Sequence, residues 1–148
     1  MIEVTKQYRT ETGHRLMDYD GRCSHYHGHS YLWEVTAILY KMDNALKSNG
    51  MVIDFSDLKA AMSFVLDPLD HAMVLFSGDP SVEIMKDLKA TNGKNPRVLV
   101  FDWNPTAENF AKYAGENIQK FMWEIDNSIR IKEVKVWETA TSYATWRA

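Results

Sequence analysis

The sequence predicts an α+β fold in which two helices pack on one face of a four-stranded antiparallel sheet. Stretches near both ends of the chain alternate between apolar and polar residues, as strands with one buried face do. Two stretches in the middle repeat apolar residues every three to four positions, as amphipathic helices do. Strands are expected before, between and after these two helices, and this order favours helices that cover one sheet face.

The composition is that of an ordinary globular protein. The 148 residues are 45% hydrophobic and 12% aromatic, which argues against disorder, and the length fits one domain over residues 1–148. The net charge of -3 argues against a broad nucleic-acid-binding face. The single cysteine cannot form an internal disulfide, and no apolar run approaches the roughly 20 residues of a membrane span. We therefore expect a soluble, cytoplasmic protein without a nucleic-acid or membrane partner.

Two neighbouring strands are expected in the first 40 residues. Residues 2–12 mix β-branched and aromatic residues with charges and read as a strand that ends at Gly13-His14. In the second predicted strand, residues 30–40, alternate apolar residues share one face. They are Tyr31, Trp33, Val35, Ala37 and Leu39. Because turn formers separate the two strands, we expect them to pair antiparallel.

The first helix is predicted over residues 58–66. A turn at residues 49–50 and a short strand at residues 51–53 precede it. The apolar residues at helical spacing are Leu58, Ala61, Met62, Val65 and Leu66. Pro68 should end the helix, and residues 69–71 should form a bend.

The second long helix follows a segment of irregular composition. Residues 77–97 are rich in turn formers around a short helix predicted near residues 81–88, and this composition assigns them no function. A short apolar strand is expected over residues 97–103. Asn104-Pro105-Thr106 then begins a helix whose apolar positions run from residue 110 to 125.

The last strands place a carboxylate on an apolar face. Residues 132–139 alternate, so that Val134, Val136 and Glu138 share one side. Burying a carboxylate alone is costly, so Glu138 should lie at the mouth of a pocket or meet a specific partner. Residues 143–146 are expected to pair as the final strand.

The residues suited to metal chemistry are concentrated in Cys23-Ser24-His25-Tyr26-His27-Gly28-His29. This run holds the only cysteine and three of the five histidines. In extended backbone His27 and His29 point to the same side, close enough to share one ion. His25 would join them if the strand began earlier, so the spacing does not decide which pair binds. A catalytic zinc usually has three protein ligands and one open position, and His14 is the natural candidate for the third ligand.

Five segments, taken in chain order, resemble the 6-pyruvoyl-tetrahydropterin synthase and 6-carboxytetrahydropterin synthase family. They are His14, Cys23-x3-His27-Gly28-His29, Leu69-Asp70-His71, Asn104-Pro105-Thr106-Ala107-Glu108-Asn109 and Trp137-Glu138-Thr139. The resemblance covers nearly the whole chain, and the ordered combination is more specific than any one segment. It implies the tunnelling fold, a homohexamer of two stacked trimeric β-barrels, and active sites at subunit interfaces. Such closure would also remove the two open edges of the predicted sheet.

The resemblance also implies a role for each of these residues. The implied zinc ligands are His14, His27 and His29. Cys23 would be the catalytic thiol, with Asp70 and His71 as its relay. Glu138 would anchor the pterin substrate and complete the catalytic set, and Thr106 is a second candidate for substrate binding.

The Cys-x3-His spacing resembles the bacterial, carboxy-forming branch of the family. Membership of that branch implies that the substrate is 7,8-dihydroneopterin triphosphate, a small-molecule partner. It would be converted to 6-carboxy-5,6,7,8-tetrahydropterin in queuosine biosynthesis, with release of acetaldehyde and triphosphate. The alternative is the pyruvoyl-forming activity, which eliminates triphosphate. Thr12-Gly13 departs from the small aliphatic pair common in the family, and the segment 77–97 is longer than in compact members. Arg15 and Arg22 are candidates for holding the triphosphate.

Plainer interpretations of the same residues remain open at this point. Asp70-His71 could form a polar turn, and Glu138 could be a solvated strand end. Thr106 and Glu108 could serve only the helix N-terminus. Cys23 could be a fourth ligand rather than a reactive thiol, which would make the chain a non-catalytic zinc-binding scaffold. In a zinc hydrolase, Cys23 would be incidental.

Overall fold

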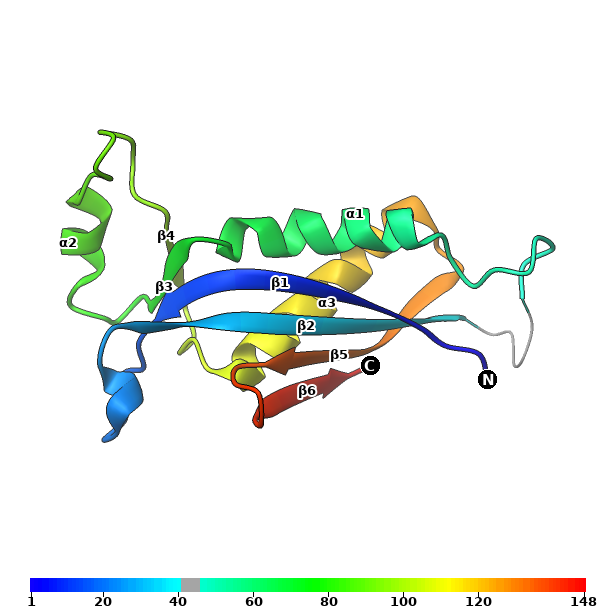
Figure 1. Ribbon diagram of the computed structural model, residues 1–148, viewed down its shortest axis with the longest axis horizontal. Helices are drawn as coiled ribbons and strands as arrows, with labels where there is room; N and C mark the ends of the chain where they lie inside the picture. Colours follow the sequence, from blue (N-terminus) through cyan, green and yellow to red (C-terminus); the bar gives the residue numbers. More distant parts are fainter. Residues whose placement is uncertain (41–45) are drawn as a thin grey trace.

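A six-stranded sheet with two long helices on one face forms the body of the protein (Figure 1). The computed structural model describes residues 1–40 and 46–148. The strands within these residues are β1 (Val4–His14), β2 (His27–Leu39), β3 (Ala72–Phe76), β4 (Val98–Phe101), β5 (Ile129–Trp137) and β6 (Tyr143–Arg147). Their order across the sheet is β4-β3-β1-β2-β5-β6.

The expected four-stranded, fully antiparallel sheet is wrong in two respects. β3 and β4 extend the sheet beyond β1, and both the β1/β3 and the β3/β4 pairs are parallel. The sequence of β3 is only five residues long and directly follows the turn after Pro68, so it has no room for a visible alternation. The antiparallel pairing predicted for the first two strands is confirmed, and it extends from Val4 opposite Ala37 to His14 opposite His27.

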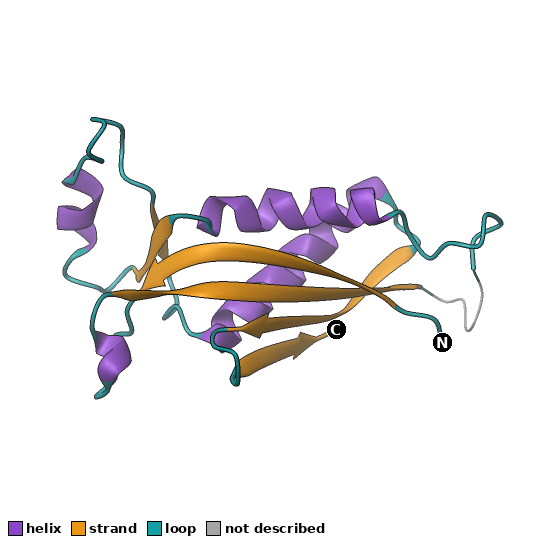
Figure 2. Cartoon of the chain, in the orientation of Figure 1, coloured by secondary structure: helices purple, strands orange, loops and turns teal. Residues whose placement is uncertain are grey.

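Two long helices, α1 (Phe55–Leu66) and α3 (Ala107–Ile125), lie along one side of the sheet (Figure 2). Side chains cap both N-termini, because Asp54 accepts a hydrogen bond from the Ser56 amide and Thr106 accepts one from the Asn109 amide. The short helix α2 (Val82–Asp87) confirms the helix expected near residues 81–88. The strand expected at residues 51–53 does not form.

The core lies between the two long helices and the inner face of β2. The predicted apolar face of β2 is confirmed, because all five of its residues are buried. Phe110 of α3 packs edge-on against Tyr31 and Trp33 in this core. No helix among the described residues is both long and apolar enough to cross a membrane.

A β-bulge changes the side-chain alternation within β5. Thr36 pairs with Glu133 whereas its neighbour Ala37 pairs with Ile131, so Lys132 is the extra residue. Ile131 and Val134 therefore both face the core although they are three residues apart. The predicted strand at residues 132–139 begins earlier than expected, at residue 129, because the bulge breaks the alternation on which the prediction relied.

Candidate metal centre

The facing ends of β1 and β2 bring three histidines together. His14 ends β1 and pairs directly with His27, the first residue of β2. His29 pairs with Thr12, two residues before His14. One nitrogen from each of the three histidines lies within 4.8 Å of the other two. The antiparallel register therefore supplies the third imidazole that the His-x-His spacing alone could not.

The side chain of His25 lies outside this cluster. β2 begins only at His27, and His25 is an exposed residue directly after the short 3-10 helix η1 (Arg22–Ser24). The backbone of His25 still contributes, because its carbonyl oxygen accepts a hydrogen bond from Nδ1–H of His27 at 2.7 Å. The three imidazoles that converge are thus those of His14, His27 and His29.

The hydrogen bonds of the cluster fit a bound metal ion. Nδ1–H of His14 donates to the carbonyl oxygen of Pro105 at 2.7 Å, which fixes that ring as the His25 carbonyl fixes His27. Nε2 of His27 and Nε2 of His29 are buried, and neither has a hydrogen-bond partner among the described residues. Buried nitrogens without a partner are rare in folded proteins. Histidines held by a carbonyl through one nitrogen commonly bind metal through the other.

Burial favours the neutral, metal-binding form of two of the three cluster histidines, His14 and His29. Burial lowers the pKa of His14, although the Pro105 carbonyl opposes this effect. Burial also lowers the pKa of His29, and the nearby carboxylate of Glu138 opposes it. A neutral imidazole offers its nitrogen lone pair to a cation, whereas a protonated one does not.

Glu138 lies just beyond the end of β5 and next to the cluster. Its Oε1 lies 3.7 Å from Nε2 of His29, and the hydroxyl of Tyr31 donates to its Oε2 at 3.2 Å. The Tyr31 hydroxyl also lies 3.4 Å from Nε2 of His14. Burial, followed by the charge of Glu138, raises the pKa of Tyr31, so this hydroxyl remains a donor. Glu138 therefore has specific partners and is not simply a solvated strand end.

Cys23 lies in η1 and is half-buried. Its carbonyl oxygen accepts a hydrogen bond from the amide of Leu16 at 2.7 Å, which ties η1 to the residues after His14. η1 lies in the connection between the two strand ends that carry His14 and His27. The Cys23 sulfur is not among the three atoms that converge within 4.8 Å. The converging ligand atoms among the described residues are therefore all imidazole nitrogens.

Asp70 and His71 form a hydrogen-bonded pair outside the histidine cluster. Nδ1–H of His71 donates to Oδ2 of Asp70 at 2.8 Å, and Oδ1 of Asp70 accepts from the amide of Glu11 at 2.8 Å. The amide of His71 donates to the carbonyl of Glu11, and its φ of 54° lies in the left-handed region that side chains rarely adopt. The side chain of His71 is 73% exposed, so this imidazole is presented to solvent.

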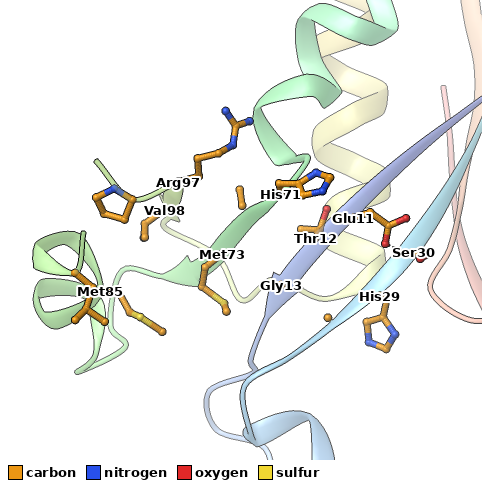
Figure 3. Close-up of a pocket in the computed structure, with 14 residues that line it drawn as sticks. Glu11, Thr12, Gly13, His29, Ser30, His71, Met73, Met85, Arg97 and Val98 are labelled. Atoms are coloured by element: carbon orange, nitrogen blue, oxygen red, sulfur yellow. Dashed lines mark hydrogen bonds between the residues drawn. The ribbon is translucent and has the colours of Figure 1, made fainter. Parts of the chain in front are cut away.

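His71 lines a pocket of about 600 Å³ beside β1 and β3. Figure 3 shows His71 and His29 separated by β1 and β2, with the ring of His29 directed away from His71. Glu11 and Ser30 line the same pocket and are hydrogen-bonded to each other at 2.5 Å. Strand alternation places these two residues on the sheet face opposite Thr12 and His29. His29 also lines this pocket, but His71 is not among the three histidines whose nitrogens converge within 4.8 Å.

The sequence matches the family model described as 6-pyruvoyl tetrahydropterin synthase over residues 3–148. The chain belongs to this family. It is 32% identical over 151 residues to the 6-carboxy-5,6,7,8-tetrahydropterin synthase of Haemophilus influenzae, with 99% of each chain covered. It is 30% identical over 162 residues to the protein of that name from Aquifex aeolicus, covering 98% of this chain and 97% of that one.

Solved structures support the fold assignment. The 6-pyruvoyl tetrahydropterin synthase of Plasmodium falciparum superimposes with a TM-score of 0.71 at 21% identity, covering 99% of this chain and 97% of that one. The α+β fold of the synthase family, expected from the sequence resemblance, is confirmed.

The sequence pointed to most of the groups around the centre of this synthase-family chain but missed two. Pro105 belongs to a motif whose Thr106 hydroxyl caps α3, and its carbonyl holds the His14 ring. Tyr31 was assigned only to the core, yet its hydroxyl reaches both His14 and Glu138. The position of Tyr31 two residues after His29, on the same face of β2, was the available signal.

Proposed function

We propose that this chain is a zinc-dependent carbon-carbon lyase that converts 7,8-dihydroneopterin triphosphate to 6-carboxy-5,6,7,8-tetrahydropterin, with release of acetaldehyde and triphosphate. The observation that carries the proposal is the convergence of three histidines, in a chain whose full-length relatives bear the name of that synthase. Queuosine biosynthesis in the cytoplasm is the setting that the sequence resemblance implies. The alternative activity eliminates triphosphate and forms a pyruvoyl pterin, because the matching family model is described as 6-pyruvoyl tetrahydropterin synthase.

His14, His27 and His29 would hold the ion. Three imidazoles suit zinc and leave a position open for substrate. When bound, zinc supplies Lewis-acid polarisation of the oxygens of the substrate side chain.

Glu138 would anchor the pterin. A carboxylate can accept two parallel N–H bonds from an amino-pyrimidine edge, which fixes orientation as well as adding binding energy. The Tyr31 hydroxyl already donates to Glu138, so the carboxylate is oriented before substrate arrives. Thr106 caps α3 through its hydroxyl, and its amide and carbonyl are hydrogen-bonded to Asn104 and Phe110, so a substrate contact would use its methyl group or its hydroxyl.

Cys23 would remove and return protons on the substrate side chain, and the Asp70-His71 pair would relay them. Because that pair lies away from the metal centre of its own chain, the pair of one copy would serve the centre of a neighbouring copy. A homohexamer built from trimeric barrels would allow this arrangement. In support, no described strand pairs with residues 4–11 of β1 on the side away from β2, and β6 forms an open edge.

The experiment is incubation of the purified, zinc-loaded protein with 7,8-dihydroneopterin triphosphate. Acetaldehyde would be assayed and the pterin product identified by mass spectrometry. Acetaldehyde with a carboxylated pterin supports the proposal. Formation of a pyruvoyl pterin would support the alternative activity instead. Unchanged substrate would contradict both activities.

A further inference from the structure

A buried ion pair joins the residue after His14 to the turn that follows β3. The guanidinium of Arg15 contacts Asp79 through two hydrogen bonds, from Nε to Oδ2 at 2.6 Å and from an Nη to Oδ1 at 2.5 Å. The side chain of Asp79 is fully buried and that of Arg15 is 20% exposed. A bidentate pair of this kind fixes orientation as well as supplying energy.

Asp79 is itself held in place, so the pair is a fixed anchor rather than a flexible contact. Its Oδ1 accepts hydrogen bonds from both the amide and the hydroxyl of Ser81, and its own amide donates to the carbonyl of Phe76 at the end of β3. These contacts fix the position of the Arg15 guanidinium. Arg15 directly follows His14 and begins the segment that connects β1 to β2.

Arg15 and its neighbour Leu16 contact the segment that carries Cys23. The guanidinium of Arg15 stacks over the ring of Tyr26, with the Cζ atom 4.3 Å from the ring centroid. The next residue, Leu16, donates its amide to the carbonyl of Cys23 at 2.7 Å. Both ends of the short stretch from Cys23 to Tyr26 are therefore tied to residues 15 and 16.

We propose that Asp79 is a positioning residue that acts through Arg15 and Tyr26 to hold Cys23 at the metal centre. This inference rests on the proposed function, in which Cys23 is the reactive thiol. It gives the longer segment 77–97 a role, because its Asp79 reaches back to the residue adjoining His14. Loss of the Asp79 charge releases the guanidinium, the Tyr26 ring loses its partner, and the stretch around Cys23 loosens.

The chain contains a matched control for this interaction. Asp126 forms an ion pair with Lys47 at 2.5 Å and accepts hydrogen bonds from the amide and the hydroxyl of Ser128, as Asp79 does from Ser81. Asp126 caps the C-terminal end of α3, away from the cysteine segment. Asp126→Asn therefore removes a similarly hydrogen-bonded but more exposed ion pair without touching the proposed anchor.

The test compares wild type, Asp79→Asn and Asp126→Asn as zinc-loaded full chains. Because the chain has one cysteine, alkylation by iodoacetamide reports on Cys23 alone. In Asp79→Asn we expect a several-fold change in the alkylation rate constant and a fall in kcat of about tenfold with KM within about twofold, as for a misplaced catalytic group. Asp126→Asn should match wild type in both measurements.

Equal alkylation rate constants in Asp79→Asn and wild type would overturn the proposal, as would equal changes in Asp79→Asn and Asp126→Asn. If Asp79→Asn does not fold, Tyr26→Leu replaces it, since this side chain is 44% exposed and its loss removes only the ring that meets Arg15. The alkylation comparison decides the inference even if wild type releases no acetaldehyde, in which case the proposed function alone would fail.

Discussion

Nδ1 of His14 lies 2.7 Å from the carbonyl oxygen of Pro105, a residue 91 positions later in the chain. This contact joins the end of β1 to the residue before the N-cap of α3. It turns the other ring nitrogen of His14 towards His27 and His29. The arrangement of the histidine cluster thus depends on how α3 meets the sheet as well as on the two strands that carry the histidines.

Zinc binding should depend on the histidines inside the cluster and not on their neighbour. His27→Ala removes one of the three proposed ligands. Losing a group that only hydrogen-bonds to a ligand typically lowers metal affinity by about 10- to 100-fold, so we expect a larger fall in zinc affinity for this variant. His25→Ala is the matched control, because that side chain is exposed and its backbone carbonyl is unchanged. Metal content after dialysis against a competing chelator measures the difference. Equal zinc retention in the two variants would contradict the assignment.

Complementation between copies tests whether the Asp70-His71 pair acts on a neighbouring metal centre. Cys23→Ser and His71→Ala should each lack turnover. Co-purified mixed oligomers of the two variants should regain part of the activity, because some sites would combine an intact thiol with an intact pair. The measurement is acetaldehyde release before and after subunit exchange. Activity that stays absent in verified mixed oligomers would place the pair's partner within its own chain.

Thr106 offers a test that separates helix capping from substrate binding. Thr106→Ala removes the cap of α3 and should lower the free energy of unfolding by about 1 kcal/mol. Thr106→Ser keeps the hydroxyl that accepts the Asn109 amide and should retain most of that stability. Chemical denaturation measures both values. If the KM for the pterin substrate rises in the alanine variant alone, the hydroxyl matters to substrate; a rise in both variants would assign the effect to the methyl group.

The stability of the protein should depend on pH through Asp79. The Arg15 guanidinium lowers the pKa of Asp79 from 3.8 to about 2. A carboxyl whose pKa is lower in the folded state stabilises the fold above its unfolded pKa, and this contribution is lost as pH falls from about 4 to about 2. In Asp79→Asn the free energy of unfolding should therefore fall less steeply over this range. Urea denaturation at several pH values measures the slopes, and parallel slopes would contradict the ion-pair assignment.

Two leucines test the assignment of the core. Leu58 is fully buried under the sheet, whereas Leu88 is 55% exposed beside α2. Leu58→Ala should cost about 2–5 kcal/mol of unfolding free energy, because the cavity is only partly refilled. Leu88→Ala should change it by less than about 1 kcal/mol. Similar losses in the two variants, measured by denaturation, would show that Leu58 is not packed in the core between α1 and the sheet.

The sequence predicted the elements whose side chains repeat regularly over many residues. The buried face of β2 and the long helix α3 are examples, since each presents a periodic apolar pattern. It did not predict β3, because five residues after a proline turn are too few to show a period. Parallel pairing of β3 with β1 also depends on contacts between residues about 60 positions apart, and local patterns carry no information about such contacts.

For the candidate site, the residue types were visible in the sequence but their arrangement was not. His27 and His29 could be paired by strand alternation, and His14 joined them only through the register of β1 and β2. The separation of Asp70-His71 from the histidines could not be read from the chain, because it depends on which side of the paired strands each side chain occupies. The Arg15-Asp79 pair likewise joins residues 64 positions apart.

The extra residue Lys132 divides β5 into two halves that bury their side chains in opposite phase. Glu138 follows the second half, whose Val134 and Val136 face the core. A shift in the first half, where Ile129 and Ile131 meet the core, can be absorbed at the bulge before it reaches the carboxylate. Residues near 129 are therefore separated from Glu138 by the irregular pairing at Lys132, which lies between the two halves of the strand.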